Sequence, residues 1–232
     1  MDQEVSAHKV PLRPFELLGE AKSLLGDQYW LFVGITFVGI LIGSFVPLGI
    51  LLGPMMCGIH LCYIQRINSK PASFELLFKG FDFFVESLIA TLIMVAVGVV
   101  VIVPVYIIFM IVFVGIMASS GGEPDPAAVL PLMMIMYPII IGLSILVGLP
   151  FIFVYPLIVD RGLKAVPAVK ASFRGVLTNA FGVFGLVFVY TVISFIASCL
   201  CYFPAIMFLP LSLCGIFLAY RKIYTKEPPA FM

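Results

Sequence analysis

The sequence predicts an all-α membrane protein, a polytopic bundle of about six transmembrane helices with amphipathic helices at the cytoplasmic interface. Hydrophobic residues make up 62% of the 232 residues, and the mean hydropathy is +1.20. Charged residues make up 11%, under half of the roughly 25% found in soluble domains. A globule of this size could not bury so much apolar surface, so part of the solvent must be lipid. The composition argues against a nucleic-acid-binding domain, a disordered chain and a secreted disulfide scaffold.

Four long windows lack Asp, Glu, Lys and Arg. The first and last contain 38 and 46 residues. As single helices they would measure about 57 and 69 Å, roughly twice the ~30 Å hydrocarbon core, so each is expected to cross twice. Pro47 and Pro204 mark the expected breaks, because proline cannot continue the helical hydrogen-bond ladder. The windows are residues 28–65, 87–122, 126–159 and 175–220, and the four spans predicted in the outer two are 29–46, 48–65, 181–201 and 204–220.

Basic residues set the predicted topology. All 13 lie in four segments, whereas the external loop predicted at 118–126 has none and contains Glu123 and Asp125. Under the positive-inside rule the basic segments are cytoplasmic, which requires one crossing each for spans 88–117 and 127–159 and places both termini in the cytoplasm. The basic residues are Lys9, Arg13, Lys22, Arg66, Lys70, Lys79, Arg161, Lys164, Lys170, Arg174, Arg221, Lys222 and Lys226.

The N-terminal segment does not have the pattern of a cleavable signal. Residues 1–28 carry five acidic side chains and no apolar core, so the first span is expected to be retained. The simplest compartment is then a cell membrane, and a bacterial inner membrane is the expected one.

Three amphipathic segments, 14–27, 73–86 and 166–179, precede membrane entries. Each is expected to lie in the cytoplasmic interface with its apolar face in the acyl boundary. They could simply anchor the bundle, or they could form a collar that binds headgroups or a partner. The third segment is the most basic, and anionic headgroups would attract each positive charge by about 1 kcal/mol. The candidate headgroup contacts are Arg161, Lys164, Lys170 and Arg174.

The two ends of the chain suggest a parallel internal repeat. Residues 14–67 and 167–223 each contain an amphipathic segment, two spans broken at proline and a basic exit. Pairs of glycines four residues apart also predict close helix packing, which is commoner within a bundle than between molecules. These pairs are Gly39 with Gly43 and Gly49 with Gly53.

No catalytic, cofactor-binding or metal-binding residue is predicted. The spans carry no Asp, Glu, Lys or Arg, which argues against an intramembrane protease and most proton-driven carriers. His60 is close to Cys57 and Cys62, but these cysteines would point about 140° apart on a helix and could not chelate a metal together without another helix, from which Cys214 would be a candidate ligand. No cofactor is expected.

Several short motifs resemble a known family. They are residues 156–163 (Pro-Leu-Ile-Val-Asp-Arg-Gly-Leu) with Ala168, Ser172, Arg174 and Asn179, and the segments 73–81, 209–212 and 219–221. With these motifs the chain resembles a broad group of bacterial integral membrane proteins similar to the membrane domain fused to some glycerophosphoryl diester phosphodiesterases. The resemblance implies a six-span membrane module. The phosphodiesterase catalytic domain has no counterpart in this sequence, so that activity is not implied.

These observations favour a non-enzymatic integral membrane protein, a structural, assembly or accessory subunit that binds anionic lipid on its cytoplasmic face. The expected partners are membrane lipids and other membrane protein subunits, and not nucleic acid; the oligomeric state is left open. The alternative is a small transporter or channel for an apolar or lipid-like solute. A polar stripe along several spans would favour transport, but the polar residues of the spans are scattered. They include Thr36, Thr91, Tyr106, Tyr137, Ser144, Tyr190, Thr191 and Ser194.

Overall fold

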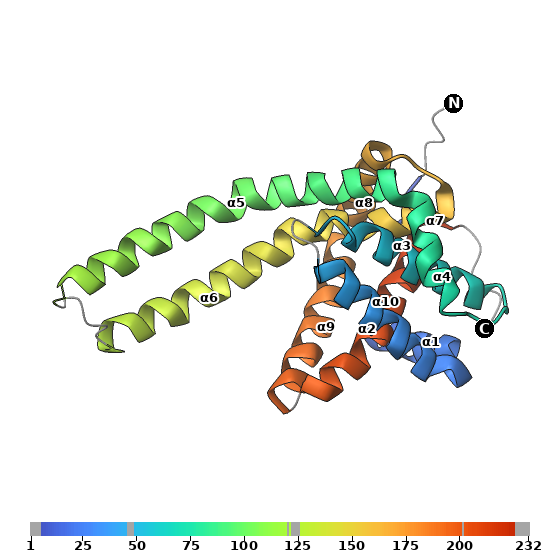
Figure 1. Cartoon of the computed structure of the whole chain (residues 1–232), viewed down its shortest axis with the longest axis horizontal. Coiled ribbons are helices and arrows are strands. Elements are labelled where there is room, and N and C mark those ends of the chain that lie inside the picture. Colours follow the sequence, from blue (N-terminus) through green and yellow to red (C-terminus); the bar gives the residue numbers. More distant parts are fainter. Residues whose placement is uncertain (1–5, 46–48, 120, 122–125, 201, 226–232) are drawn as a thin grey trace. The chain divides into compact units, whose positions relative to one another are not determined.

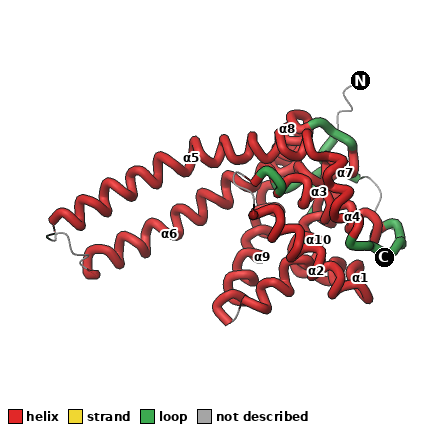
Figure 2. Tube along the Cα trace, viewed as in Figure 1, coloured by secondary structure: helices red, strands yellow, loops and turns green. Residues whose placement is uncertain are grey.

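The fold is all-α, as the sequence predicts. The computed structural model describes residues 6–45, 49–119, 121, 126–200 and 202–225, and every regular element within these ranges is a helix (Figures 1 and 2). The chain divides into two compact units. Unit 1 comprises Met1–Leu92 and Pro150–Met232, and unit 2 comprises Ile93–Leu149.

Helices α2 (Tyr29–Phe45) and α3 (Leu52–Ile67) pack against each other in unit 1. Glycines allow the close approach: a Cβ atom at Gly39 would lie 3.0 Å from Ile59 Cδ1, and one at Gly43 would lie 3.0 Å from Leu52 Cα. The close intramolecular packing predicted from the glycine spacing is confirmed at these two positions. The predicted break at 46–48 lies outside the described residues.

Helix α1 (Pro14–Leu25) uses its apolar face inside the bundle, not in the lipid. Leu17, Ala21 and Leu25 are buried, and α1 packs against α10 (Tyr202–Tyr224). The amphipathic period is correctly predicted, but the expectation that this face enters the acyl boundary is wrong. Periodicity identifies an apolar face without naming the surface that covers it.

The amphipathic segment 73–86 does not form one helix. A single α-helical turn, α4 (Glu75–Phe78), leads into a 3-10 helix, η3 (Lys79–Phe83), and then into α5 (Phe84–Ser119). Leu77 faces the bundle and is buried, whereas Phe74, Phe78 and Phe81 are exposed. The backbone of η3 lies directly against α3, and this contact is the physical reason for the altered winding.

The predicted span 127–159 is divided by a turn. Helix α6 (Pro126–Gly148) is followed by the 3-10 turn Leu149–Phe151 and by α7 (Val154–Arg161). Pro150, which lacks a backbone N–H, lies in this turn. Helix α7 belongs to unit 1, where it packs against α3 and α8 (Ala165–Thr178).

Unit 2 consists of the outer part of α5 and helix α6, which run in opposite directions (Figure 1). No described side chain between residues 93 and 148 is buried, and the most hydrophobic stretch of the helix containing α5 has a mean hydropathy of 3.1. Side chains of this kind are stable when lipid surrounds them. Helix α5 has 36 residues and is about 54 Å long, which exceeds the ~30 Å hydrocarbon core and requires a tilt or a projecting end.

Among the described residues, five helical segments are long and apolar enough to cross a membrane. The chain is therefore a multi-pass membrane protein by its helix lengths and composition. Helix α3, at the position of the predicted span 48–65, has only 16 residues and is about 24 Å long, shorter than a usual span. The sixth crossing therefore stays a prediction. The five segments are Pro14–Phe45, Glu75–Ser119, Val129–Arg161, Ala180–Leu200 and Phe203–Tyr224.

The repeat is visible in the order of helices and not in their packing. Each copy contains a short helix followed by two longer ones, α1 to α3 and α8 to α10, where α9 is Ala180–Leu200. Helices α2 and α3 pack together, as do α9 and α10. However, α1 packs mainly against α10, whereas α8 packs mainly against α7. A parallel relation between the copies stays a prediction.

Candidate functional site

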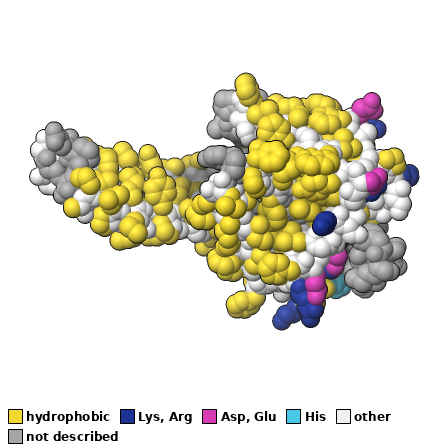
Figure 3. All heavy atoms as spheres, turned by 90° about the horizontal axis from the view of Figure 1, so that it is seen from below, with side chains coloured by type: hydrophobic (Ala, Val, Ile, Leu, Met, Phe, Trp, Pro, Cys, Tyr) yellow, Lys and Arg dark blue, Asp and Glu magenta, His cyan; other side chains and the backbone are white. Residues whose placement is uncertain are grey.

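Charged side chains gather along one end of unit 1, while hydrophobic side chains cover most of its remaining visible surface (Figure 3). This end contains the C-terminal turns of α3, α7 and α10. It corresponds to the predicted cytoplasmic side, so it is the first place to look for a function at the membrane surface. Several charged side chains at this end form ion pairs with one another, and we call this group the charged end. Its members are Glu20, Asp27, Arg66, Asp160, Arg161, Arg221 and Lys222.

Asp160 is the centre of the charged end. Its side chain is only 14% exposed and accepts a hydrogen bond of 2.7 Å from the Tyr220 hydroxyl group. The guanidinium groups of Arg161 and Arg221 each lie 3.6 Å from its carboxylate oxygens. Since Tyr220 and Arg221 belong to α10, the carboxylate ties the end of α7 to the end of α10.

Arg161, one of the four candidate headgroup contacts, is part of this structural network. Its Nη2 donates a hydrogen bond of 2.9 Å to the carbonyl oxygen of Tyr224. The Tyr224 hydroxyl group in turn donates 2.8 Å to the carbonyl oxygen of Ala171 in α8. The main interactions of Arg161 are therefore with the bundle.

Two further contacts at the charged end involve the N-terminal half of the chain. Lys222 Nζ lies 2.6 Å from Glu20 Oε1, which joins α10 to α1. Arg66 pairs with Asp27 and donates a hydrogen bond of 2.8 Å from Nε to the carbonyl oxygen of Leu24. Much of the basic charge at the helix ends therefore serves to hold neighbouring helices together.

The remaining three candidates lie in or directly before α8: Lys170 and Arg174 belong to the helix and Lys164 precedes it, and all three are exposed. The first turn of α8 is held by Glu86, whose Oε2 accepts a hydrogen bond of 2.7 Å from the Ala165 backbone N–H. A carboxylate is favourable there because the N-terminal end of a helix carries partial positive charge. The basic side chains are thus displayed on a helix whose start is fixed.

The buried face of α8 consists mainly of small residues. Ala168, Ser172 and Gly175 face the bundle, and a Cβ atom at Gly175 would collide with the Tyr224 hydroxyl group. Val176 is also buried on this face. Small side chains let α8 lie close to its neighbours, and this closeness leaves its larger side chains on the outside.

The outward face of α8 presents an apolar stripe beside a basic stripe. Successive residues lie about 100° apart around a helix, so Val166, Phe173 and Leu177 fall within an arc of about 40°. All three are exposed. Lys170 and Arg174 occupy the next ~60° of the same face. We call these five residues the α8 stripe pair; the arrangement suits a helix that lies in a membrane interface.

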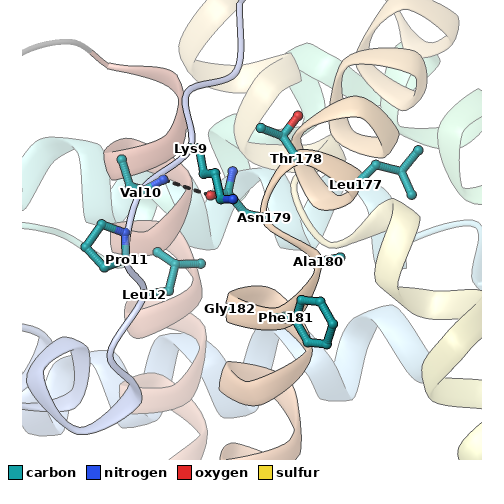
Figure 4. Close-up of a pocket in the computed structure, with 10 residues that line it drawn as sticks. All are labelled: Lys9, Val10, Pro11, Leu12, Leu177, Thr178, Asn179, Ala180, Phe181 and Gly182. Atoms are coloured by element: carbon teal, nitrogen blue, oxygen red, sulfur yellow. Dashed lines mark hydrogen bonds between the residues drawn. The ribbon is translucent and has the colours of Figure 1, made fainter.

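A cavity of about 580 Å³ lies between the N-terminal segment and the junction of α8 with α9. Figure 4 shows Val10, Pro11 and Leu12 on one side and the α8–α9 junction on the other. Asn179 holds the two sides together. Its Oδ1 accepts a hydrogen bond of 2.9 Å from the Val10 N–H (Figure 4), and its Nδ2 donates one of 2.9 Å to the His8 carbonyl oxygen. We call this the strap cavity.

The interior of unit 1 contains a small polar group. Tyr63 stacks on Phe32 at 5.3 Å between ring centroids and donates a hydrogen bond of 3.0 Å to the Pro210 carbonyl oxygen. His60 is buried beside Phe217, and its Nδ1 has no hydrogen-bond partner among the described residues. Within the same described residues, no three His, Cys, Asp or Glu side chains are grouped so that they could hold a metal ion.

The family of the chain follows from its central and C-terminal regions. Residues 75–229 match the family described as a domain of unknown function (DUF7847). The chain belongs to the DUF7847 family. No curated protein and no solved structure matches the chain.

The DUF7847 region holds all four candidate headgroup residues, the Asp160 network and the whole of α8. Helices α1 to α3 and the N-terminal segment precede it. The strap cavity therefore combines a wall from the DUF7847 region with a wall from outside it.

Two residues of the strap cavity, Asn179 and Lys9, are not among the site residues predicted from the sequence. Asn179 carries a signal that could have been used, since an Asn between an amphipathic helix and a span is suited to satisfy backbone groups where one helix ends and another begins. Lys9 offers no such signal. The return of residues 8–12 to the bundle depends on hydrogen bonds over about 170 positions along the chain.

Proposed function

We propose that this DUF7847 protein is a non-enzymatic subunit of the cell membrane, with a structural, assembly or accessory role, that binds anionic lipid on its cytoplasmic face. The observation that carries the proposal is the α8 stripe pair, in which exposed Lys170 and Arg174 stand beside exposed Phe173 and Leu177. The apolar stripe would enter the acyl region while the basic stripe meets the phosphate groups.

The electrostatic part of this binding is modest for each residue and useful in sum. Lys164, Lys170 and Arg174 would each contribute about 1 kcal/mol at an anionic surface, and less as salt screens them. Arg161 is left out of the lipid-binding set, because it bonds to Asp160 and to the Tyr224 backbone. The bacterial inner membrane, the cytoplasmic termini and the similarity to the membrane domain of glycerophosphoryl diester phosphodiesterases are parts of the same proposal, and they rest on the charge distribution and motifs of the sequence.

The transport alternative gains no specific support from the described residues. Thr36 and Thr91 are buried within unit 1, and the Thr91 hydroxyl group bonds within its own helix and to Tyr155. In unit 2, Tyr106 and Tyr137 are exposed on the surfaces of α5 and α6.

Replacing Lys164, Lys170 and Arg174 with Gln tests the proposal. We expect the variant to retain far less anionic phospholipid on purification in a neutral detergent, because up to about 3 kcal/mol of surface attraction is removed at low salt. Its melting temperature in that detergent should stay close to the wild-type value, since these side chains are exposed. Lipid content is measured by mass spectrometry and stability by thermal unfolding.

A charge-matched control variant replaces Lys22, Lys70 and Lys79, which are also exposed. It should keep the wild-type anionic lipid content if α8 is the binding element. Equal lipid loss in both variants would show that only net charge matters. Unchanged lipid content with a lower melting temperature in the α8 variant would show that these residues anchor the bundle, and the proposal would fail.

A further inference from the structure

We propose that the strap cavity binds one anionic phospholipid molecule, with Lys9 pairing with its phosphate and the apolar side of the cavity receiving the start of an acyl chain. This inference rests on the proposed function, because it assumes that this end of the bundle meets anionic lipid. It goes further by naming a site with its own walls, separate from the α8 stripe pair.

The volume and the lining of the cavity suit a phospholipid headgroup region. Small-molecule sites commonly occupy about 300–1,000 Å³ and combine an apolar lining with a few polar groups. The strap cavity measures about 580 Å³. Lys9 and Thr178 supply polar groups, while Leu12, Leu177 and Phe181 supply apolar surface.

The charge of the lining selects an anion. Lys9 is the one ionisable side chain that lines the cavity, and no hydrogen bond or ion pair engages it within the described part of the chain. A lysine ammonium group offers three donors to a phosphate group. The Asn179 side chain, by contrast, is already committed to the backbone groups of Val10, His8 and Gly175.

The place of the cavity between two kinds of helix suits an amphiphile. One wall is the end of the amphipathic helix α8, and the next is the beginning of α9, which has no charged residue and is long enough to span a membrane. Phe181, in the first turn of α9, is 96% exposed. A molecule in the cavity could therefore place a phosphate by Lys9 and an alkyl chain along Phe181, toward the hydrocarbon.

The walls are preformed, which reduces the ordering cost of binding. The N-terminal segment is held by the two Asn179 hydrogen bonds and by a third of 2.9 Å from the His8 N–H to the Ile223 carbonyl oxygen. Gly182 permits close contact at the base of the cavity, because a Cβ atom there would lie 3.2 Å from Leu12 Cβ.

The test uses the full-length protein, delipidated in neutral detergent, and native mass spectrometry with a short-chain phosphatidylglycerol as the probe. We expect one molecule to bind tightly to the wild type. Lys9→Gln should weaken this binding about tenfold or more, since a charge-assisted pair is lost, and Lys9→Arg should restore it. Ala180→Trp should block the site sterically, because exposed Ala180 lines the cavity. Lys22→Gln, at an exposed lysine of α1, is the matched control and should bind like the wild type.

Two comparison ligands identify the source of the anion. Matched short-chain phosphatidylcholine should bind much more weakly than phosphatidylglycerol, and inorganic phosphate at similar concentration should not displace the lipid. Equal binding of phosphatidylcholine would overturn the role of Lys9 in headgroup charge recognition. Displacement by inorganic phosphate would overturn the lipid assignment in favour of a free anion site.

The outcome is separable from that of the proposed function. If Lys9→Gln and Ala180→Trp bind phosphatidylglycerol as well as the wild type does, the strap cavity is not the site, whatever the α8 variant shows. If the α8 triple variant keeps its total anionic lipid while these two variants lose the single tight molecule, the cavity is supported and the α8 interface is rejected. Thermal unfolding of both cavity variants checks that they remain folded, and their exposed positions make this the expected result.

Discussion

Two glycines place the backbones of α4 and η3 against the backbone of α3. A Cβ atom at Gly58 would collide with the carbonyl oxygen of Leu77, and one at Gly80 would collide with the carbonyl oxygen of Pro54. The obstacle in both cases is main chain, which cannot rotate away as a flexible side chain can. The absence of a side chain at these residues is therefore required for the position of the segment that leads into α5.

We expect Gly58→Ala to destabilise the protein by about 1–3 kcal/mol, the usual cost of overpacking a close contact. The measurement is the melting temperature in a neutral detergent. Gly19→Ala is the matched control, because Gly19 lies within α1 and a Cβ atom there would meet no other atom within 4 Å. The control should be neutral or more stable by up to about 1 kcal/mol. An unchanged melting temperature for Gly58→Ala would show that α3 and α4 can move apart without cost.

At the scale of the elements, the ends of α7 and α10 are joined by one carboxylate. Asp160 accepts the Tyr220 hydrogen bond and lies between Arg161 and Arg221. The side chains of these arginines are 34% and 27% exposed, so solvent screens each ion pair and limits its contribution. The hydrogen bond is at the least exposed point of the network and should contribute more.

Asp160→Asn should lower the free energy of unfolding by about 1–2 kcal/mol, because the amide can still accept from Tyr220 but leaves two guanidinium groups without a counter-charge. Thermal unfolding in detergent at low and high salt measures this loss, which should shrink as salt screens the arginines. Asp27→Asn is the comparison: its carboxylate also pairs with an arginine, but it is 77% exposed. A cost at Asp27 as large as that at Asp160 would contradict the assignment of Asp160 as the link between the helices.

At the scale of the whole molecule, the basic segments and the apolar helices predict which side of the membrane each loop faces. Ser69 lies just after α3 and is exposed, and Lys164 lies just before α8 and is exposed. Ser172 belongs to the same predicted cytoplasmic segment but is buried, with its hydroxyl oxygen accepting 3.2 Å from the Phe153 N–H. A cysteine at Ser172 would thus be protected on either side, and Lys164 is the informative position.

Single cysteines at Ser69, Ser120 and Lys164, in a cysteine-free background, test this topology. An impermeant thiol reagent added outside intact cells should label only the Ser120 position, which lies outside the described residues. Permeabilised cells should give labelling at Ser69 and Lys164, which serves as the positive control. Labelling of Ser69 in intact cells would contradict the predicted side of the α3–α4 connection and the cytoplasmic position of both termini.

Much of the architecture can be predicted from the sequence, because lipid imposes strong and local requirements on a chain. A long uncharged window must be helical, since hydrocarbon cannot satisfy backbone hydrogen bonds. Helices α2, α5, α9 and α10 accordingly begin and end within a few residues of their predicted bounds. The amphipathic face of α1 is equally evident, because its apolar residues follow the helical period.

Only the tertiary structure decides what each of these faces touches. The apolar face of α1 lies on α10, the largest apolar side chains of α8 point outward, and the segment 73–86 winds as two short helices against α3. The candidate site divides in the same way: Arg161 is bound to Asp160 and Tyr224, while Lys9 joins the site through hydrogen bonds that Asn179 makes across the chain. Composition and periodicity record how much apolar or charged surface a helix carries, but the partner of that surface depends on contacts between residues far apart in sequence, and these form only when the chain is folded.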